Sequence, residues 1–508
     1  MPVARTYSVA LNGLLGSVVE VEADIAPGLP HTVIIGLGDT AVSQARDRVR
    51  AAGINAGCPL TSRKLTINLS PAALPKHGSA FDLAIALASL AADGAVSAAS
   101  VASTVHLGEL GLDGRLRPVT GVLPAVLALA RAGHDRVMVP SANADEACLV
   151  PGVTVIPASS LREAAILHGG EYESVPVEPV AVALETEVAE TEGDLSDVVG
   201  NADAVEALVV AAAGGHHVFM VGPPGAGKTM LAERLPGILP DLDEDASLEV
   251  ASIRSLSGRP LGSRLPRRPP IETPHHTATA AAMVGGGSGS IRPGAAVRAS
   301  HGVLFLDEAP EFSAAVLDCL RQPLESGTVS IHRASGVARF PASFQLVLAA
   351  NPCPCGQYGA SDTACACAPH ARRRYLARLS GPLMDRIDIQ LTLRRATSAG
   401  LREGRGALTT IEARERVVAA RAAARSRLAG TPWTGNAQLP GRWLREARRR
   451  SAPSATAALD RALERGAITM RGYDRVLRLA WTIADLDGTT SPGADEIGRA
   501  LYLRRGAS

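Results

Sequence analysis

The spacing of apolar and polar residues divides the chain into regions of different structure. Near the start, apolar positions alternate with polar ones in RTYSVALNG, VVEVEADI and HTVIIGL, which predicts half-buried strands. The segments TAVSQARDRVRAAG and AFDLAIALASLAA carry apolar residues at helical spacing. A mixture of strands and helices around one core predicts an α+β domain over residues 1–170.

Short, continuously apolar runs replace the alternating pattern from residue 195 onwards. HVFMVG, VLFLDE and FQLVLAANP predict buried strands, and ADAVEALVVAAAGG predicts a helix that ends at a glycine pair. Strands of this kind, separated by helices and long insertions, indicate a mostly parallel sheet covered on both faces. We expect residues 195–393 to form an α/β domain.

The last region is helical by its pattern. From about Arg394, the segments TIEARERVVAARAAARSRLAG, GRWLREARRR, ATAALDRALERG and MRGYDRVLRLAWTIADL predict an all-α domain over residues 394–508. Residues 171–194, with eight acids, two prolines and no base, predict an acidic linker between the first two domains. A chain of 508 residues is too long for one core, so we expect a multidomain protein.

Composition narrows the class of protein. No apolar run approaches the ~18 residues of a membrane helix. The first residues lack the layout of a secretion signal. Seven cysteines do not predict a disulfide framework in so long a chain. We therefore expect a soluble cytoplasmic protein with no membrane partner. The net charge is +1, but residues 371–508 hold 27 arginines against 13 acidic residues. A surface that faces a polyanion and a solvated arginine face in an arginine-rich chain both remain open.

One glycine-rich segment carries the strongest chemical signal. It fits the pattern G-x-x-x-x-G-K-[ST], follows the apolar run HVFMVG and opens the helical run TMLAERL. The backbone N–H groups of such a loop and the N-terminus of the helix face phosphate oxygens. The predicted nucleotide-binding residues are Gly222, Pro223, Pro224, Gly225, Ala226, Gly227, Lys228 and Thr229.

Lys228 is one of only three lysines in a chain that has 48 arginines. A lysine brings a compact, flexible charge to the β- and γ-phosphates, whereas the planar guanidinium of arginine is too bulky and too rigid for this cradle. This requirement explains why the composition bias has not removed the lysine. The Thr229 hydroxyl is predicted to bind Mg²⁺, so ATP and Mg²⁺ are the expected cofactors.

Polar residues at the ends of two further predicted strands complete the site. Asp307 and Glu308 close VLFLDE, and acids at this end of a parallel strand face the phosphate site. Asp307 is predicted to hold Mg²⁺, mainly through water, and Glu308 to orient and polarise the attacking water. Asn351 ends a third strand and can contact the γ-phosphate or that water. Arg386 is a candidate for a contact with the nucleotide of a neighbouring subunit. Arg471 is a candidate for a contact with the nucleotide from the helical domain. Their spacing in the sequence alone selects neither of them.

Four cysteines form a second candidate site. Cys353, Cys355, Cys365 and Cys367 follow the pattern C-x-C-x₉-C-x-C. Four thiols this close together in a cytoplasmic chain predict a tetrahedral Zn²⁺ site. The C-x-C spacing is tighter than the commoner zinc pattern, so a metal-free loop lined by thiols, or redox-labile cysteines, remains open.

Several segments together resemble one protein family. VGPPGAGKTMLAERLPGILP, PHHT, GVLFLDE, LRQPLESGTVSIHRA, LAANPCPCG and LSGPLMDRIDI are similar to the magnesium-chelatase-like AAA+ ATPases called YifB or ComM, and the resemblance covers nearly the whole chain. It implies a ring, usually a hexamer, with ATP sites between subunits. The roles it implies are Walker A for Lys228 and Thr229, Walker B for Asp307 and Glu308, sensor 1 for Asn351, arginine finger for Arg386 and sensor 2 for Arg471.

The resemblance also implies a function on DNA. ComM-type members are implicated in natural transformation as DNA helicases that drive branch migration, and recombination repair is an alternative setting. In related ring ATPases a hairpin just before sensor 1 points into the central pore. The segment SGTVSIHRASGVARFPASF predicts such a hairpin, so His332 and Arg333 are candidate DNA contacts. A solvated surface hairpin is the alternative.

Two other functions are alternatives to the DNA motor. One is a chelatase-type ATPase that remodels a partner protein during metal insertion into a porphyrin. The other is a non-catalytic, nucleotide-gated assembly factor, and the intact set of Lys228, Asp307, Glu308 and Asn351 argues against it. The basic helical third of the chain favours the motor.

The first domain resembles the Lon-protease-type domain that these proteins carry. KHGSAFDLAIALASL is similar to the stretch that holds the nucleophilic serine of true Lon enzymes, and Ser79 lies nearest that place. RPVTGVLPAVLALARAGHDRVMVP is similar to the stretch that holds their catalytic lysine, but no lysine occurs from Val119 to Pro140. A serine without a base to take its proton is inert, so we predict no peptidase activity.

Overall fold

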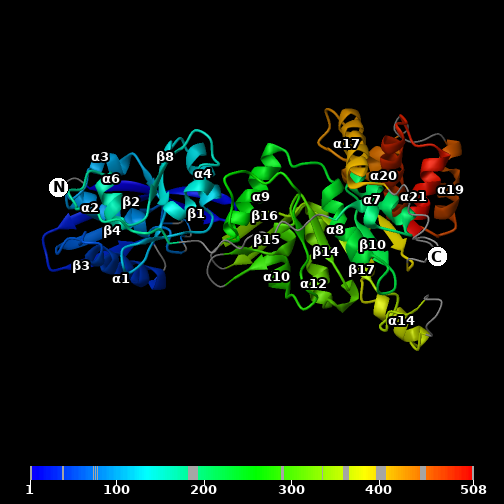
Figure 1. The fold of residues 1–508 in the computed structure, drawn as a ribbon, viewed down its shortest axis with the longest axis horizontal. Coiled ribbons are helices and arrows are strands. Elements are labelled where there is room, and N and C mark those ends of the chain that lie inside the picture. Colours follow the sequence, from blue (N-terminus) through cyan, green and yellow to red (C-terminus); the bar gives the residue numbers. More distant parts are fainter. Residues whose placement is uncertain are drawn as a thin grey trace.

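The computed structural model arranges the chain as three units in a row (Figure 1). The front unit (residues 3–180), the central unit (residues 193–395) and the helical unit (residues 408–505) follow one another along the long axis. None of the helices described is long and apolar enough to cross a membrane. Residues 181–192 of the predicted linker lie outside the described residues. The structure describes residues 3–36, 39–72, 74, 76, 78–180, 193–287, 291–333, 336–358, 365–395, 408–446 and 453–505.

The front unit is built on a mixed sheet of seven strands in its described part, in the order β3-β4-β2-β1-β5-β8-β9. β1 and β2 pair antiparallel, whereas β5, β8 and β9 pair in parallel. The predicted alternating runs lie in β1, β2 and β3, where inward-facing residues such as Val19 and Val21 are buried. The elements are β1 (Ala4–Asn12), β2 (Leu15–Ala26), β3 (His31–Ile35), α1 (Asp39–Asn55), β4 (Lys64–Ser70), α2 (Asp82–Ala92), α3 (Ala98–Ala102), β5 (Val105–His106), β6 (Glu109–Leu110), β7 (Leu116–Arg117), α4 (Val122–Arg131), β8 (Arg136–Pro140), α5 (Ala144–Ala147), β9 (Thr154–Ala158) and α6 (Leu161–Leu167).

The central unit holds a sheet of parallel strands in the order β11-β14-β17-β10-β18. β14 and β17 are buried along their whole length, as expected for a parallel sheet covered on both faces. The predicted strands HVFMVG, VLFLDE and FQLVLAANP correspond to β10, β14 and β17. The elements are α7 (Ala202–Gly214), β10 (Val218–Val221), α8 (Lys228–Ile238), α9 (Glu244–Leu256), β11 (Ile271–Glu272), α10 (Ala280–Val284), β12 (Gly285–Gly286), β13 (Arg292–Pro293), α11 (Ala295–Arg298), β14 (Val303–Leu306), α12 (Ala314–Cys319), α13 (Arg321–Ser326), β15 (Thr328–Arg333), β16 (Gly336–Pro341), β17 (Gln345–Ala350), α14 (Pro369–Leu376), α15 (Gly381–Met384) and β18 (Ile389–Thr392).

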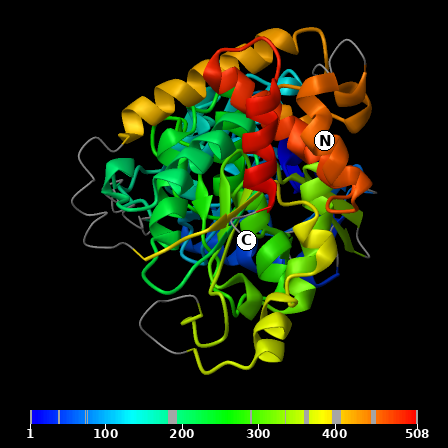
Figure 2. The same cartoon turned by 90° about the vertical axis from the view of Figure 1, so that its right-hand side faces the viewer.

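The helical unit shares its core with the central unit. α7 is apolar on nearly all sides, so it packs on the sheet strand β18 and also against α17 and α20. Figure 2 shows α17 lying across the helices of the central unit. The last third is therefore helical as predicted, but its hydrophobic core is continuous with that of the parallel sheet. The helices are α17 (Thr410–Arg427), α18 (Gly441–Arg445), α19 (Pro453–Glu464), α20 (Met470–Asp487) and α21 (Ala494–Arg505).

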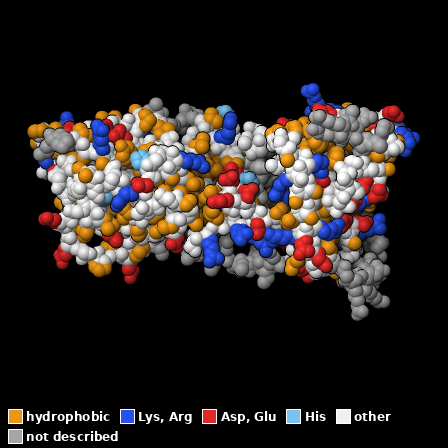
Figure 3. Space-filling model, turned by 90° about the horizontal axis from the view of Figure 1, so that it is seen from above, with side chains coloured by type: hydrophobic (Ala, Val, Ile, Leu, Met, Phe, Trp, Pro, Cys, Tyr) orange, Lys and Arg blue, Asp and Glu red, His pale blue; other side chains and the backbone are white. Residues whose placement is uncertain are grey.

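Many arginines of the last third form ion pairs within the chain. Figure 3 shows basic side chains interspersed with acidic ones over the visible face of the molecule. Arg414 pairs with Asp241 and Arg416 with Glu206, so both tie α17 to the central unit. Part of the positive charge of the last third is thus neutralised by acidic side chains of the same chain. Further pairs of this kind include Arg427–Asp485, Arg445–Asp474, Arg475–Asp388 and Arg499–Asp487.

The front unit contacts the central unit at the β15–β16 hairpin and at α9. The Asn12 side-chain amide donates to the carbonyl of Val337 on β16 at 3.2 Å. Gly13 adopts a left-handed φ of +66°, and a Cβ atom there would lie 2.8 Å from the carbonyl oxygen of Arg339. Elsewhere, the N–H of Gly121 donates to the carbonyl of Ser255 at 3.1 Å, next to the packing of α4 on α9. The β15–β16 hairpin is therefore braced by the turn between β1 and β2.

A buried ion pair fixes the helical unit to the edge of the parallel sheet. The side chain of Asp388, just before β18, is only 3% exposed, and it pairs with Arg475 of α20. It also accepts the N–H of His217 at 3.2 Å, and Nδ1 of His216 lies 3.4 Å away. Burial favours the neutral acid, but Arg475 and His216 outweigh it and hold the pKa of Asp388 well below its usual range.

We predict that Arg475→Ala lowers the free energy of unfolding by about 3–5 kcal/mol, because it leaves a buried carboxylate without its cation. Arg471→Ala is the matched control on the same helix. Its side chain is 77% exposed and lies 4.0 Å from Asp385, so we expect a change of at most about 1 kcal/mol. Urea unfolding followed by tryptophan fluorescence measures both variants.

The low pKa of Asp388 also gives the Arg475 experiment a pH dependence. The stability that the ion pair contributes is fully present above the ordinary carboxyl pKa of about 4, and it declines as the pH falls below that value. Arg475→Ala should show a weaker decline. Equal losses of stability in the Arg475 and Arg471 variants would contradict this account.

Candidate functional site

The glycine-rich loop lies where parallel strands converge. It leaves β10 at Val221, which pairs with Ala350 of β17 and with Thr392 of β18. Gly225 and Gly227 adopt left-handed φ values of +76° and +85°, which residues with a Cβ atom rarely adopt. The sequence folds here as predicted, into a strand, a tight loop and the helix α8, which begins at Lys228.

The Lys228 ammonium lies at the centre of the site and is only 8% exposed. Its Nζ donates to the carbonyl oxygens of Gly222 at 2.6 Å and Pro223 at 3.1 Å, and to Oδ1 of Asn351 at 3.1 Å. Burial lowers the pKa of Lys228, while the nearby carboxylates of Asp307 and Glu308 oppose that shift. Lys228 therefore brings a cation to the point where the loop meets β17.

The strand-end acids lie beside the first turn of α8. The hydroxyl of Thr229 donates to Oδ2 of Asp307 at 2.9 Å, and the N–H of Glu308 donates to Oδ1 of the same carboxylate at 2.8 Å. Glu308 has a φ of +49°, an uncommon backbone conformation for a residue with a side chain. A hydroxyl and a carboxylate are oxygen donors of the kind that Mg²⁺ prefers, so the residues present fit this ion.

His276 also lies at the site, although in the sequence it stands out only as part of the segment PHHT. Glu272 of β11 pairs in parallel with Leu304 of β14, so the residues four positions further on come together. Nδ1 of His276 lies 3.7 Å from Oε2 of Glu308. The ring of His275 packs against that of His276 with centroids 4.1 Å apart. Strand register creates this contact, and a single sequence does not reveal it.

Two further polar residues contact the loop and were missed. The Asn201 side-chain amide donates to the carbonyl oxygen of Ala226 at 3.3 Å and to that of Arg394 at 3.1 Å. Nε of Arg395 donates to the carbonyl oxygen of Pro224 at 3.3 Å. Both come from segments far from the loop in sequence, and no motif marks them.

The two candidate arginines have partners outside this chain's own loop. Arg386 pairs with Glu325 and donates to the carbonyl of Pro382 at 2.5 Å. Burial lowers its pKa, and the neighbouring cations Arg471 and Arg475 add to the effect. Among the described residues, no hydrogen bond or ion pair joins Arg386 or Arg471 to the glycine-rich loop or to the strand-end acids.

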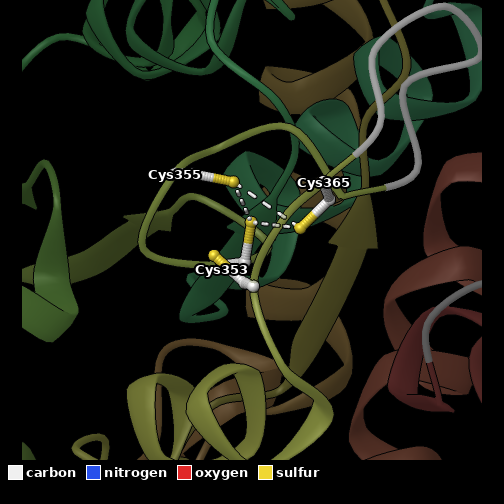
Figure 4. Close-up of side chains that lie close together, drawn as sticks. Cys353, Cys355 and Cys365 are labelled. Carbon is white, nitrogen blue, oxygen red and sulfur yellow. Dashed lines mark hydrogen bonds between the residues drawn. The ribbon is translucent and has the colours of Figure 1, made fainter.

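The four cysteines converge, as predicted, around one point. The sulfur atoms of Cys353, Cys355 and Cys365 are separated by 3.3, 3.5 and 3.6 Å (Figure 4). Cys367 completes a set whose ligand atoms all lie within 4.8 Å of one another. A disulfide requires about 2.05 Å, whereas Zn–S bonds of about 2.3 Å in a tetrahedron place the sulfurs about 3.8 Å apart. The arrangement fits one tetrahedral ion.

The remaining predicted residues lie in the hairpin and the front unit. His332 is exposed near the end of β15, and the side chain of Arg333 lies outside the described part of the chain. The Ser79 hydroxyl donates to the carboxylate of Glu109. The Lys76 ammonium donates to backbone carbonyl oxygens, at 2.5 Å for that of Pro71.

Comparison with known proteins finds related families. Three family models match: "Magnesium chelatase, subunit ChlI" over residues 194–401, "Subunit ChlI of Mg-chelatase" over residues 21–143, and "Magnesium chelatase, subunit ChlI C-terminal" over residues 407–504. The chain is also 32% identical over 170 residues to a Lon protease of Salinispora arenicola, a match that covers 31% of this chain and 20% of that protein.

Full-length relatives show the same relationship. An uncharacterised protein of Mycobacterium tuberculosis is 47% identical over 508 residues, 99% of each chain. The competence protein ComM of Haemophilus influenzae is 37% identical over 506 residues, 99% of this chain and 98% of that protein. YifB of Escherichia coli is 37% identical over 494 residues, 96% of this chain and 94% of that protein. The chain therefore belongs to the YifB/ComM family of magnesium-chelatase-like AAA+ proteins.

Proposed function

We propose that this protein is a cytoplasmic ATPase that assembles into a hexameric ring and drives branch migration of DNA as a helicase. The observation that carries the ATPase is the single sheet edge at which Lys228, Thr229, Asp307, Glu308 and Asn351 meet. ATP and Mg²⁺ are its cofactors. The loop cradles the phosphates through backbone N–H groups and the N-terminus of α8, and Lys228 neutralises the β- and γ-phosphates.

The strand-end residues supply the chemistry of hydrolysis. Thr229 and Asp307, already joined by a hydrogen bond of 2.9 Å, hold Mg²⁺ beside the phosphates. Glu308 orients and polarises the attacking water, and Asn351, which contacts Lys228 at 3.1 Å, positions that water or the γ-phosphate. The Glu308 carboxylate lies 3.7 Å from Nδ1 of His276, whereas the Asp307 carboxylate accepts from Thr229, so the two acids take separate roles.

Arg386 acts between subunits in this proposal, and Arg471 acts from the helical unit. Arg386, which lies apart from its own chain's loop, is the finger that reaches a neighbour's nucleotide, where it stabilises charge in the transition state. Arg471 projects from α20 into solvent and reaches a nucleotide as sensor 2. The arrangement within one chain supports this interpretation, because neither guanidinium group contacts the Lys228 site among the described residues.

The DNA motor rests on the hairpin and on the relatives. β15 and β16 pair antiparallel, and His332 is exposed on the hairpin, with Arg333 next in the chain. Cationic groups there would follow DNA phosphates in a ring's pore. The Haemophilus influenzae relative is named competence protein ComM. We therefore propose that this protein acts on DNA in natural transformation or in recombination repair.

A chelatase-type ATPase, which remodels a partner protein during metal insertion into a porphyrin, is the second candidate. The observation that favours it is the description of the matching family models, which name a subunit of magnesium chelatase. We expect no peptidase activity in either case. A serine needs an adjacent base to act as a nucleophile. The lysine nearest Ser79 in the sequence is Lys76, and its ammonium group donates to backbone carbonyl oxygens.

We predict that Lys228→Arg weakens the binding of a fluorescent, nonhydrolysable ATP analogue at least about tenfold, a change of about 1.4 kcal/mol. The buried pocket that holds Nζ does not admit a planar guanidinium. Lys64→Arg is the matched control, because Lys64 is exposed in the front unit and should leave affinity unchanged. Wild-type affinity in the Lys228 variant would exclude the loop as the nucleotide site.

The motor itself is tested on a synthetic three- or four-stranded DNA junction. We predict that the wild type displaces a strand only with ATP and Mg²⁺. Glu308→Gln should bind ATP and DNA but displace nothing, because its amide cannot polarise water. No displaced strand from the wild type, together with ATPase activity that DNA does not change, would favour the chelatase-type function.

We also propose that Cys353, Cys355, Cys365 and Cys367 bind one Zn²⁺. Protein purified without chelator should contain about one zinc per chain. Cys355→Ser and Cys365→Ser should each reduce the content below half an equivalent. Cys148→Ser is the control, because Cys148 is an exposed cysteine of the front unit. A wild type with less than half an equivalent of zinc would retire this assignment.

A further inference from the structure

The cysteine loop (residues 353–358 and 365–367) folds back onto the glycine-rich loop. Gly356 adopts a left-handed φ of +75°, and a Cβ atom there would lie 2.9 Å from both Cγ and Cδ of Pro224. Such an approach is closer than side-chain carbons tolerate, so only glycine fits between the two loops. The same Cβ atom would lie 3.9 Å from Cγ of Asn351.

A second contact joins the two loops through Arg395. Its Nε donates to the carbonyl oxygen of Pro224 at 3.3 Å, and its Nη2 donates to Oε1 of Gln357 at 3.2 Å. Arg395 lies just beyond β18, which pairs with β10. One guanidinium therefore connects the backbone of the glycine-rich loop to a side chain of the cysteine loop.

The third link runs through the strand end. Cys353 is fully buried and follows Asn351 by two residues, and Asn351 accepts from Nζ of Lys228 at 3.1 Å. The cysteine loop thus contacts Pro224 of the glycine-rich loop and is continuous with Asn351, the partner of Lys228. The convergence of the four sulfurs in turn sets the shape of the loop.

We propose that the cysteine loop is a positioning element of the nucleotide site, so that Zn²⁺ bound by the four cysteines and ATP bound by the glycine-rich loop strengthen each other's binding. This inference rests on the proposed function. A metal ion supplies the bonds that hold a short loop of four thiolates in one shape. When two ligands favour the same arrangement, each raises the affinity for the other by the same factor.

Because each ligand should raise the affinity for the other by the same factor, both affinities can be measured in the full-length protein and compared. The dissociation constant of a fluorescent, nonhydrolysable ATP analogue is measured with Mg²⁺ in zinc-loaded protein, and again after zinc is stripped and the chelator removed. We expect weaker binding without zinc, by about 5- to 150-fold. Competition with a chromophoric zinc chelator, with and without the analogue, should show the same factor for zinc affinity.

Gly356→Val separates the contact between the loops from the binding of metal. This variant keeps all four cysteines, so we expect it to retain about one zinc per chain. Its side chain pushes the cysteine loop from Pro224, so nucleotide affinity should fall about tenfold and should no longer depend on zinc. Gly356→Ala is the milder second variant if valine prevents folding.

Gly466→Val is the matched control for backbone strain. Gly466 has a comparable φ of +66°, but a Cβ atom there meets nothing within 4 Å. It should keep both wild-type nucleotide affinity and the dependence on zinc. Loss of nucleotide affinity in this control equal to that of Gly356→Val would overturn the inference.

Other outcomes distinguish this inference from the proposed function. Equal nucleotide affinity with and without zinc, together with unchanged affinity in Gly356→Val, would overturn the coupling and leave the ATPase standing. A chain that binds no zinc would also overturn it. Zinc-loaded wild type that binds no nucleotide would instead refute the proposed function.

Discussion

The site depends on one buried ammonium held at the meeting point of a loop and a strand. Lys228 is bound by carbonyl oxygens of its own loop and by the amide oxygen of Asn351. Because β10 and β17 are parallel neighbours, their carboxyl ends bring these partners to the same place. The acids after β14 arrive at the same edge for the same reason, so the chemistry follows from the direction of the strands.

The helical unit is attached to this sheet by packing and by charge. α7 is buried between β18 on one side and α17 and α20 on the other, so the sheet and the helices share one core. The buried pair of Asp388 and Arg475 then fixes α20 at the end of the sheet beside β18. Arg386 and Arg471 lie near this junction. A rearrangement of the helical unit would therefore move Arg471 of α20 relative to Arg386 of the central unit.

The front unit contacts two elements of the central unit that carries the nucleotide site. Its turn between β1 and β2 contacts the β15–β16 hairpin, and α4 packs on α9. The cysteine loop contacts the glycine-rich loop at Gly356 and Pro224. The cysteine loop therefore contacts the nucleotide site directly, whereas the front unit contacts the hairpin and α9 of the same central unit.

The sequence by itself determined the features that are encoded locally. A loop pattern of eight residues, a lysine kept in an arginine-rich chain and acids at the end of an apolar run predict the core of the site. Alternating and continuous apolar runs likewise predict the strands of both sheets, because burial of one face or of both leaves a local periodicity. The close spacing of four cysteines predicts their convergence, since a short loop keeps its ends near each other.

Only the tertiary structure decided which distant residues meet. His276 reaches Glu308 through the register of β11 and β14, and Asn201 and Arg395 reach the glycine-rich loop from separate segments. The contact between Gly356 and Pro224 depends on how two loops fold over one sheet edge. The predicted helix GRWLREARRR extends only to Arg445 within the described residues, and the core predicted for a separate helical domain is shared with the sheet. Periodicity reports that a face is buried, but packing in three dimensions determines what it is buried against.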